Sequence, residues 1–184
     1  METSIIFAGF GGQGVLFAGQ LLAYAGMEEG RHVTWIPSYG PEMRGGTANC
    51  TVIISDEPIG APVVARPDVA VVLNLPSYDK YEPLVKPGGL LVVNSSIVTA
   101  VSTRTDLEIV YVPANALAEE YGATKMMNVA AVGALLARRP LLPLTAVSQT
   151  LAAHLPASKQ HLVEANLRVL QAGWQAAGEV IGER

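Results

Sequence analysis

The residues with the clearest potential for chemistry form a glycine-rich stretch, Phe7-Ala8-Gly9-Phe10-Gly11-Gly12-Gln13-Gly14-Val15. An apolar run precedes this stretch and a helical pattern follows it, so the order is strand, glycine loop, helix. In that arrangement backbone N–H groups and a helix N-terminus face an anion such as a phosphate. The glycines at 9, 11 and 14 also satisfy the G-x-G-x-x-G spacing of dinucleotide sites. The alternative is a tight turn that needs small residues only for packing.

The expected second strand does not support a standard nicotinamide site. Such a site also needs an acidic residue about 20 residues further on, where it binds the ribose. Here the strand ends Trp35-Ile36-Pro37-Ser38, and no Asp or Glu occurs from Gly30 to Pro41. The Gly-Lys-Ser/Thr of a nucleotide-binding P-loop is also absent from the glycine stretch. The glycine loop alone is therefore a weak signal.

A second unusual loop follows that strand and carries more specific chemistry. Its sequence is Pro37-Ser38-Tyr39-Gly40-Pro41-Glu42-Met43-Arg44-Gly45-Gly46. Arg44 is suited to holding a phosphate or carboxylate through two hydrogen bonds, or Glu42 and Arg44 dock on another chain. The alternative is a surface turn whose charges pair or face solvent. The candidate residues for binding a ligand or a subunit are Gly9, Gly11, Gly12, Gln13, Gly14, Ser38, Tyr39, Glu42, Arg44, Gly45 and Gly46.

Other residue types that catalyse reactions or bind metals do not form a recognisable set. His32, His154 and His161 lack the spacing of metal ligands. Cys50 lies in an expected strand, where we predict a small buried residue and not a nucleophile. Asn128 begins an expected helix and either caps it or contacts a ligand, and we favour the cap. We therefore assign no catalytic residue and no metal site.

The composition indicates one domain with few surface charges. The chain has 184 residues, of which 50% are hydrophobic and 15% charged, whereas about a quarter of the residues in soluble domains are charged. We expect other subunits to cover part of the surface, with a compact Ala- and Val-rich core as the alternative. The net charge of −4 and the lack of a basic cluster argue against nucleic acid as a partner.

The cysteine count, the first residues and the apolar runs bear on cellular location and on cofactors. The single cysteine excludes a disulfide framework or a cysteine-held cluster within one chain, and it suits a reducing cytoplasm. The first residues show no signal-peptide pattern. The longest apolar run, Val129 to Ala137, is too short to span a bilayer, which takes about 20 residues.

Alternating strands and helices must position the two loops. Apolar or β-branched runs predict strands over 4–9, 32–37, 47–55, 68–74, 90–94 and 108–112. Residues 59–64 are expected to form a short extended segment, either paired antiparallel with the preceding strand or unpaired. Helices are predicted over 14–29, 76–85, 114–121, 125–138, 144–154 and 158–178, with Gly30 as a C-cap and Ser77 as an N-cap. We predict one domain over residues 1–184, a three-layer α/β/α sandwich with a mostly parallel, mixed sheet. It has a Rossmann-like start and a helical C-terminal tail.

Taken together, the two loops resemble those of the gamma subunit of 2-oxoacid:ferredoxin oxidoreductases, in particular the 2-oxoglutarate synthase type. The resemblance rests on Gly9 to Val15 followed by Pro37 to Ala48. It extends in the same order to about residue 140, through segments 68–74, 86–89, 94–96 and 128–135. The paired loops are far more specific than either loop alone.

The resemblance implies an accessory subunit of an enzyme that oxidatively decarboxylates a 2-oxoacid to an acyl-CoA and passes electrons to ferredoxin. In that family, thiamine diphosphate with Mg and the iron–sulfur clusters lie on alpha, beta and delta chains, which would be the partners of this chain. The sequence agrees, because it lacks a Gly-Asp-Gly…Asn-Asn thiamine diphosphate signature and has one cysteine. The implied role of the two loops is to shape the coenzyme A side of a shared site.

Several alternatives remain open at this point. One alternative is that the chain is a stand-alone Rossmann-type oxidoreductase that binds NAD(P) or a flavin. Another is that it is a scaffold whose loops contact only other subunits. The 2-oxoacid, the subunit stoichiometry and self-association of the isolated chain as a homodimer are also left open, with 2-oxoglutarate as the favoured substrate.

Overall fold

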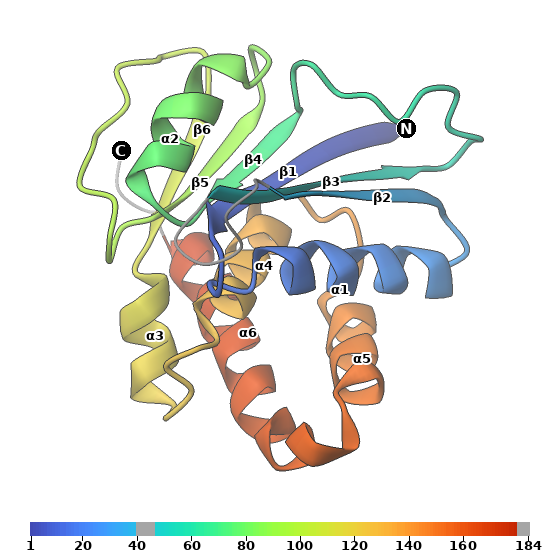
Figure 1. The fold of residues 1–184 in the computed structure, drawn as a ribbon, viewed down its shortest axis with the longest axis vertical. Coiled ribbons are helices and arrows are strands. Elements are labelled where there is room, and N and C mark those ends of the chain that lie inside the picture. Colours follow the sequence, from blue (N-terminus) through green and yellow to red (C-terminus); the bar gives the residue numbers. More distant parts are fainter. Residues whose placement is uncertain (40–46, 180–184) are drawn as a thin grey trace.

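A computed structural model describes residues 1–39 and 47–179 of the chain. One six-stranded sheet forms its centre, with helices on both faces (Figure 1). The strands are β1 (Glu2–Phe10), β2 (His32–Tyr39), β3 (Thr47–Ser55), β4 (Val69–Val72), β5 (Leu90–Asn94) and β6 (Glu108–Val112). The helices are α1 (Val15–Glu28), α2 (Leu75–Tyr81), α3 (Ala114–Glu120), α4 (Met127–Arg138), α5 (Leu144–His154) and α6 (Val163–Glu179), and two 3-10 turns cover Glu82–Leu84 and Ala157–Leu162.

The sheet is mixed, as the sequence predicts, and its strand order is β2-β3-β1-β4-β5-β6. Strand β3 pairs antiparallel with both β1 and β2. The other pairs, β1 with β4, β4 with β5 and β5 with β6, are parallel. Five strands therefore share one direction, and their carboxyl ends meet at one edge of the sheet.

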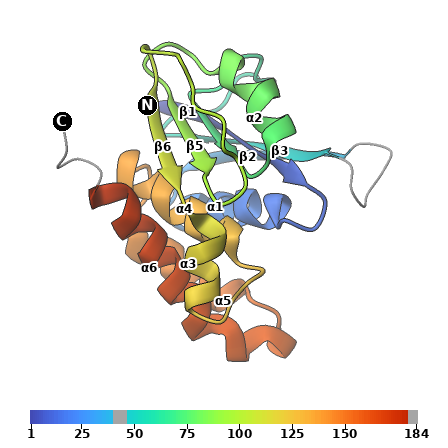
Figure 2. The ribbon, with the colours of Figure 1, turned by 90° about the vertical axis from the view of Figure 1, so that its left-hand side faces the viewer.

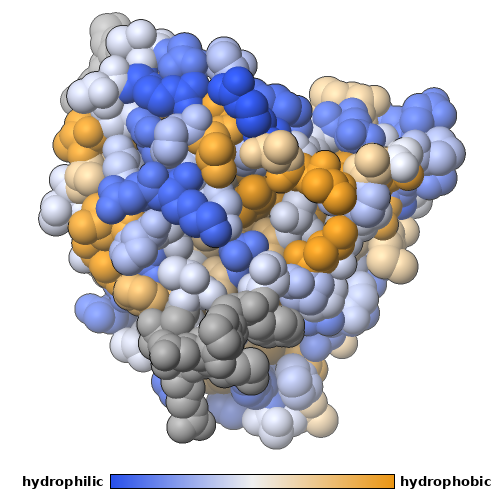
Figure 3. All heavy atoms as spheres, turned by 45° about the horizontal axis from the view of Figure 1, so that its top comes forward, coloured by the Kyte–Doolittle hydropathy of each residue, from blue (hydrophilic) through white to orange (hydrophobic). Residues whose placement is uncertain are grey.

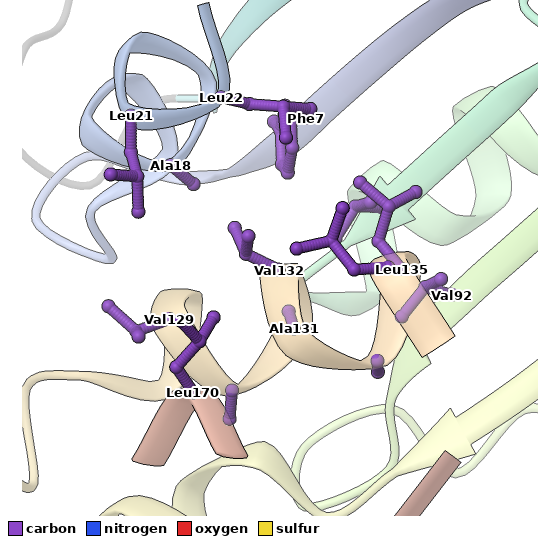
Figure 4. Packing of buried hydrophobic residues seen from close by; sticks show 14 of the residues in the cluster. Phe7, Ala18, Leu21, Leu22, Val92, Val129, Ala131, Val132, Leu135 and Leu170 are labelled. Carbon is purple, nitrogen blue, oxygen red and sulfur yellow. The ribbon is translucent and has the colours of Figure 1, made fainter. Parts of the chain in front are cut away.

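Two apolar clusters confirm the three-layer arrangement. On one face, α1, α4 and α6 pack against alternate residues of the sheet, with α5 packed against α1 and α6, and on the other face α2 covers β1, β4 and β5. Figure 2 shows α2 on the opposite side of the sheet from α4 and α6. In the larger cluster, Leu22 of α1 lies beside Phe7 of β1, and Val132 of α4 points toward them (Figure 4).

The structure corrects several of the expected elements. Residues 59–64 form no strand in the part of the chain that the structure describes. The N-cap of α2 is Asn74, whose side chain accepts a hydrogen bond from the Ser77 N–H, so Ser77 is not the cap. Gly30 terminates α1 as predicted: Glu29 is the C-cap, and Gly30 directly after it has a left-handed φ of 73°. The expected helix over 158–178 is divided into a 3-10 turn and α6.

Candidate functional site

The two predicted loops are anchored at the same edge of the sheet. The first loop follows Phe10 at the end of β1, and Phe10 pairs with Thr47, the first residue of β3. The second loop joins β2 to β3, and its first anchor, Tyr39, pairs with Ala48. Loop residues 40–46, including Glu42, Arg44, Gly45 and Gly46, lie outside the described residues. The anchors nevertheless bring both loops to the carboxyl ends of β1 and β2.

The glycine loop is held from within by the side chain of Gln13. Its Oε1 accepts the Phe10 N–H at 2.6 Å, and its Nε2 donates to the Leu73 carbonyl at 3.2 Å. A Cβ atom on Gly9 would lie 2.7 Å from that same Oε1 and 3.1 Å from the Leu73 Cβ. The close approach of Gln13 and Leu73 therefore favours a glycine at position 9.

Asn128 at the start of α4 braces the other end of the loop. Its Nδ2 donates to the Gly14 carbonyl at 3.0 Å, and its side chain is buried, with 2% exposed. Gly14 has φ 74° and forms the N-cap of α1, and a Cβ atom there would lie 2.6 Å from the Asn128 Nδ2. The prediction that Asn128 caps its own helix is wrong, because the cap of α4 is Met126 and has no side-chain hydrogen bond. The Asn128 amide is used for the glycine loop instead.

Further amide side chains line the same edge. Asn74 lies just after β4, and Asn94 is the last residue of β5. Both are fully buried. Asn74 Nδ2 donates to the Gln13 Oε1 at 3.4 Å, and Asn94 Nδ2 donates to the Asn115 Oδ1 at 2.8 Å. The first contact joins the end of β4 to the glycine loop after β1, and the second joins the end of β5 to α3, in both cases through neutral groups.

Charge is unevenly distributed between the two edges of the sheet. At the amino ends of the strands, Lys86 pairs with Asp68 at 2.7 Å and Glu108 pairs with Arg138 and Arg139. Burial raises the pKa of the Glu108 carboxyl, but the hydrogen bonds from the two arginines outweigh it, so its pKa is lowered. At the carboxyl edge, none of the described segments 10–14, 73–78, 94–98, 113–118 and 126–128 contains Asp, Glu, Lys, Arg or His. The described part of this edge can bind through hydrogen bonds and apolar contacts, but it has no group suited to transferring a proton near neutral pH.

The strand order also differs from that of a dinucleotide-binding fold. In that fold, an acidic residue at the end of the second strand contacts the ribose beside the glycine loop. Here β3 lies between β1 and β2, so the end of β2 is separated from the glycine loop by an antiparallel strand. The exposed Ser38 and the strand residue Tyr39 offer no carboxylate there.

The remaining candidate residues lie elsewhere. His154 contacts Glu28 at 2.7 Å and stacks on Tyr24, far from the glycine loop along α1. Among the described residues, no group of His, Cys, Asp and Glu is placed to hold a metal ion. Cys50 is fully buried on β3, and burial raises the pKa of its thiol to about 12, as expected for a packing residue.

Sequence reasoning missed the role of Asn74 and Asn94. Both residues directly follow or end apolar runs that the sequence marks as buried strands. An amide at the end of a buried parallel strand is a usable signal, because the carboxyl ends of such strands converge on one edge. The partner of Asn128, by contrast, lies 114 residues away, and no local pattern reveals it.

No helix among the described residues is long and apolar enough to cross a membrane.

The chain is an α/β domain whose described carboxyl edge is lined by neutral side chains. Comparison with known proteins gives the family. The model of the pyruvate ferredoxin/flavodoxin oxidoreductase family matches residues 4–176, and the chain belongs to that family.

Individual relatives agree with the gamma-subunit resemblance. The chain is 40% identical over 184 residues to ketoisovalerate oxidoreductase subunit VorA of Methanothermobacter thermautotrophicus, a match that covers 98% of this chain and 37% of VorA. It is 32% identical to 2-oxoglutarate synthase subunit KorC of Methanocaldococcus jannaschii, with 98% of this chain and 96% of KorC covered. The crystal structure of a keto/oxoacid ferredoxin oxidoreductase gamma subunit from Geobacter sulfurreducens superposes with a TM-score of 0.84 at 29% identity, covering 96% of this chain and 97% of that subunit. The chain thus spans little more than a third of VorA and nearly all of the other two.

Proposed function

We propose that this chain is the gamma subunit of a 2-oxoacid:ferredoxin oxidoreductase, which converts a 2-oxoacid to an acyl-CoA and passes electrons to ferredoxin. The observation that carries the proposal is the match over 98% of the chain to KorC, a relative named as a 2-oxoglutarate synthase subunit and covered over 96% of its own length. The neutral carboxyl edge supports an accessory role, because it supplies binding surface and no catalytic acid or base among the described residues.

The redox chemistry then belongs to partner chains. Thiamine diphosphate with Mg and the iron–sulfur clusters are assigned to alpha, beta and delta subunits. The sequence supports this assignment, since its one cysteine, Cys50, is buried in the core and cannot supply a set of cluster ligands. Ferredoxin would interact with the complex through those subunits.

Affinity purification of the tagged chain from its native cell tests the subunit assignment. We expect it to elute with other polypeptides in fixed ratio, together with thiamine diphosphate and iron. Elution as a pure single chain that oxidises NADH or NADPH by itself would instead identify a stand-alone oxidoreductase.

We further propose that the two loops form part of the coenzyme A side of a shared site. The first N–H groups of α1 lack partners within the helix and carry partial positive charge, which suits a phosphate. The glycine loop in front of them is held by Gln13 and Asn128, so it is already ordered for binding. Arg44 from the second loop would add the cationic group that the described edge lacks.

The coenzyme A proposal is tested in the assembled complex. Arg44→Ala and Gly12→Ala are expected to raise the KM for coenzyme A several-fold and to leave the KM for the 2-oxoacid unchanged. Arg168→Ala, on the exposed face of α6, is the control and should alter neither constant. If the KM for coenzyme A is unchanged in the loop variants, the loops do not bind coenzyme A and contact only other subunits.

The substrate is proposed to be 2-oxoglutarate, on the resemblance of the paired loops to the 2-oxoglutarate synthase type. The relatives carry both names, 2-oxoglutarate for KorC and ketoisovalerate for VorA. Comparing the kcat/KM of the purified complex for these two acids decides between them, and a preference for the branched acid would overturn the assignment.

A further inference from the structure

One part of the sheet has no helical cover. On the face that turns away from α1, α2 packs over residues of β1, β4 and β5. Strands β2 and β3 extend beyond α2 on this face (Figure 1). Because side chains alternate along a strand, Ile36 of β2 lies on this face beside Thr51 of β3, its register partner.

Large apolar side chains are exposed on this face near the carboxyl edge. Ile36 is 41% exposed, Phe10 at the end of β1 is 37% exposed, and Leu75 at the start of α2 is 44% exposed. We call these three residues the apolar face. Figure 3 views this side of the molecule obliquely and shows hydrophobic residues gathered in an exposed group near its middle.

The strands and loops beside the apolar face are poor in charge, and the nearest charges along α2 are Asp79 and Lys80, about one turn after Leu75. Strands β2 and β3 contain no Asp, Glu, Lys or Arg, and the segments 10–14 and 73–78 contain none either. Depletion of charge around exposed large apolar residues is typical of the core of a protein–protein interface and not of surface that faces water.

The lengths of the relatives indicate what covers this face. VorA matches this chain over only 37% of its own length, so there the domain is covalently joined to a larger stretch of polypeptide. KorC matches over 96% of its length, so there the domain is a separate chain. A domain that occurs in both arrangements needs a surface that associates with the remaining sequence even without a covalent link.

We propose that the apolar face binds the polypeptide that corresponds to the part of VorA outside this domain, through an apolar and uncharged surface of that polypeptide. This inference rests on the proposed function, since it names the partner as a subunit of the same enzyme complex. A second copy of this chain is the competing occupant.

Strand β2 argues against pairing of two copies along its edge. It is the outermost strand of the sheet, and Pro37 within it has no N–H to donate to an added strand. A partner on this side therefore has to pack against the face of the sheet, where the apolar side chains lie.

The test compares Ile36→Lys with Met27→Lys. Met27, on α1, is 60% exposed, so the control places the same charge on a more exposed apolar residue away from the apolar face. Each variant is co-expressed with the remaining subunits of the complex, and association is measured by size-exclusion chromatography and native mass spectrometry. Ile36→Thr, which retains a β-branched residue, serves if the lysine variant fails to fold by circular dichroism.

We expect Ile36→Lys to weaken association with the partner chain at least tenfold, Ile36→Thr to weaken it less, and Met27→Lys to leave it unchanged. Full assembly and turnover of a folded Ile36→Lys complex would overturn the docking surface and leave the subunit assignment standing. Failure of the wild-type chain to assemble with any of these subunits would overturn both. If the isolated wild-type chain sediments as a dimer that Ile36→Lys dissociates, the occupant is a second copy and the proposal is wrong.

Discussion

The Nδ2 atom of Asn128 donates a hydrogen bond of 3.0 Å to the carbonyl oxygen of Gly14, a residue 114 positions earlier in the chain. The contact joins the start of α4 to the start of α1 across the carboxyl edge of the sheet. It holds the end of the glycine loop where α1 begins, and the absence of a side chain on Gly14 leaves room for the amide. The candidate site is therefore braced by tertiary structure and does not depend on the loop sequence alone.

Removing this brace should destabilise the fold. Asn128→Ala removes one of the two hydrogen bonds that the Gly14 carbonyl accepts, the other coming from the Ala18 N–H, and the loss of such a bond costs about 0.5–1.5 kcal/mol. Gln171→Ala, at an exposed position on α6, is the control and should change the free energy of unfolding by less than about 0.5 kcal/mol. Urea unfolding measures both. Equal stability of the two variants would show that the Asn128 contact contributes nothing.

Gly14→Ala should lower the free energy of unfolding by more than backbone strain alone explains. A left-handed conformation costs a residue other than glycine about 1–2 kcal/mol. Gly122→Ala measures that cost, because Gly122 has φ 68° and open space around its Cβ position. At Gly14 the new Cβ also collides with Asn128, which should add about 1–3 kcal/mol. In the double variant with Asn128→Ala that added part should disappear, and simple additivity of the two changes would contradict the collision.

The ion pairs at the amino edge predict a specific dependence on pH. The lowered pKa of Glu108 means that its interaction with Arg138 and Arg139 stabilises the fold above the unfolded value of about 4.3 and is lost as the pH falls through the folded pKa. Glu108→Gln should therefore be less stable than the wild type at pH 7, with the difference closing below about pH 4. Glu164→Gln, in an exposed pair on α6, should show no such trend. Thermal unfolding from pH 3 to 7 measures both profiles.

The thiol of Cys50 should be inert in the folded protein. It is fully buried and its pKa is raised to about 12, so little thiolate forms at pH 8 and reagents cannot reach it. Iodoacetamide is expected to label the protein only in denaturant, as read by intact mass. Stoichiometric labelling of the native chain within minutes would mean that β3 opens locally.

The sequence predicts the fold well because its strands are unambiguous. Runs such as Leu90 to Val93 are continuously apolar, so they specify buried strands of a parallel sheet. The insertion of β3 between β1 and β2 was not predicted, since pairing across the sheet depends on packing that local periodicity does not encode. Asn74 was likewise missed as the cap of α2, because its neighbour Ser77 has an equally suitable side chain.

The candidate site is predictable only in part. The glycine spacing identifies the loop after β1, and Pro37 with the glycines that follow identifies the loop after β2. Their anchoring at one edge follows from the pairing of Phe10 with Thr47 and of Tyr39 with Ala48. This pairing cannot be predicted from local patterns in one sequence. The roles of the amides depend on contacts between distant elements.

Reconstitution with and without this chain tests the central claim most directly. The remaining subunits of the complex are assayed for reduction of ferredoxin that depends on both a 2-oxoacid and coenzyme A, first alone and then with the purified chain added. We predict that the chain by itself neither reduces ferredoxin nor binds NADH, that the remaining subunits alone have little activity, and that equimolar addition restores turnover. Full activity in its absence, or NADH-dependent turnover by the isolated chain, would contradict the account.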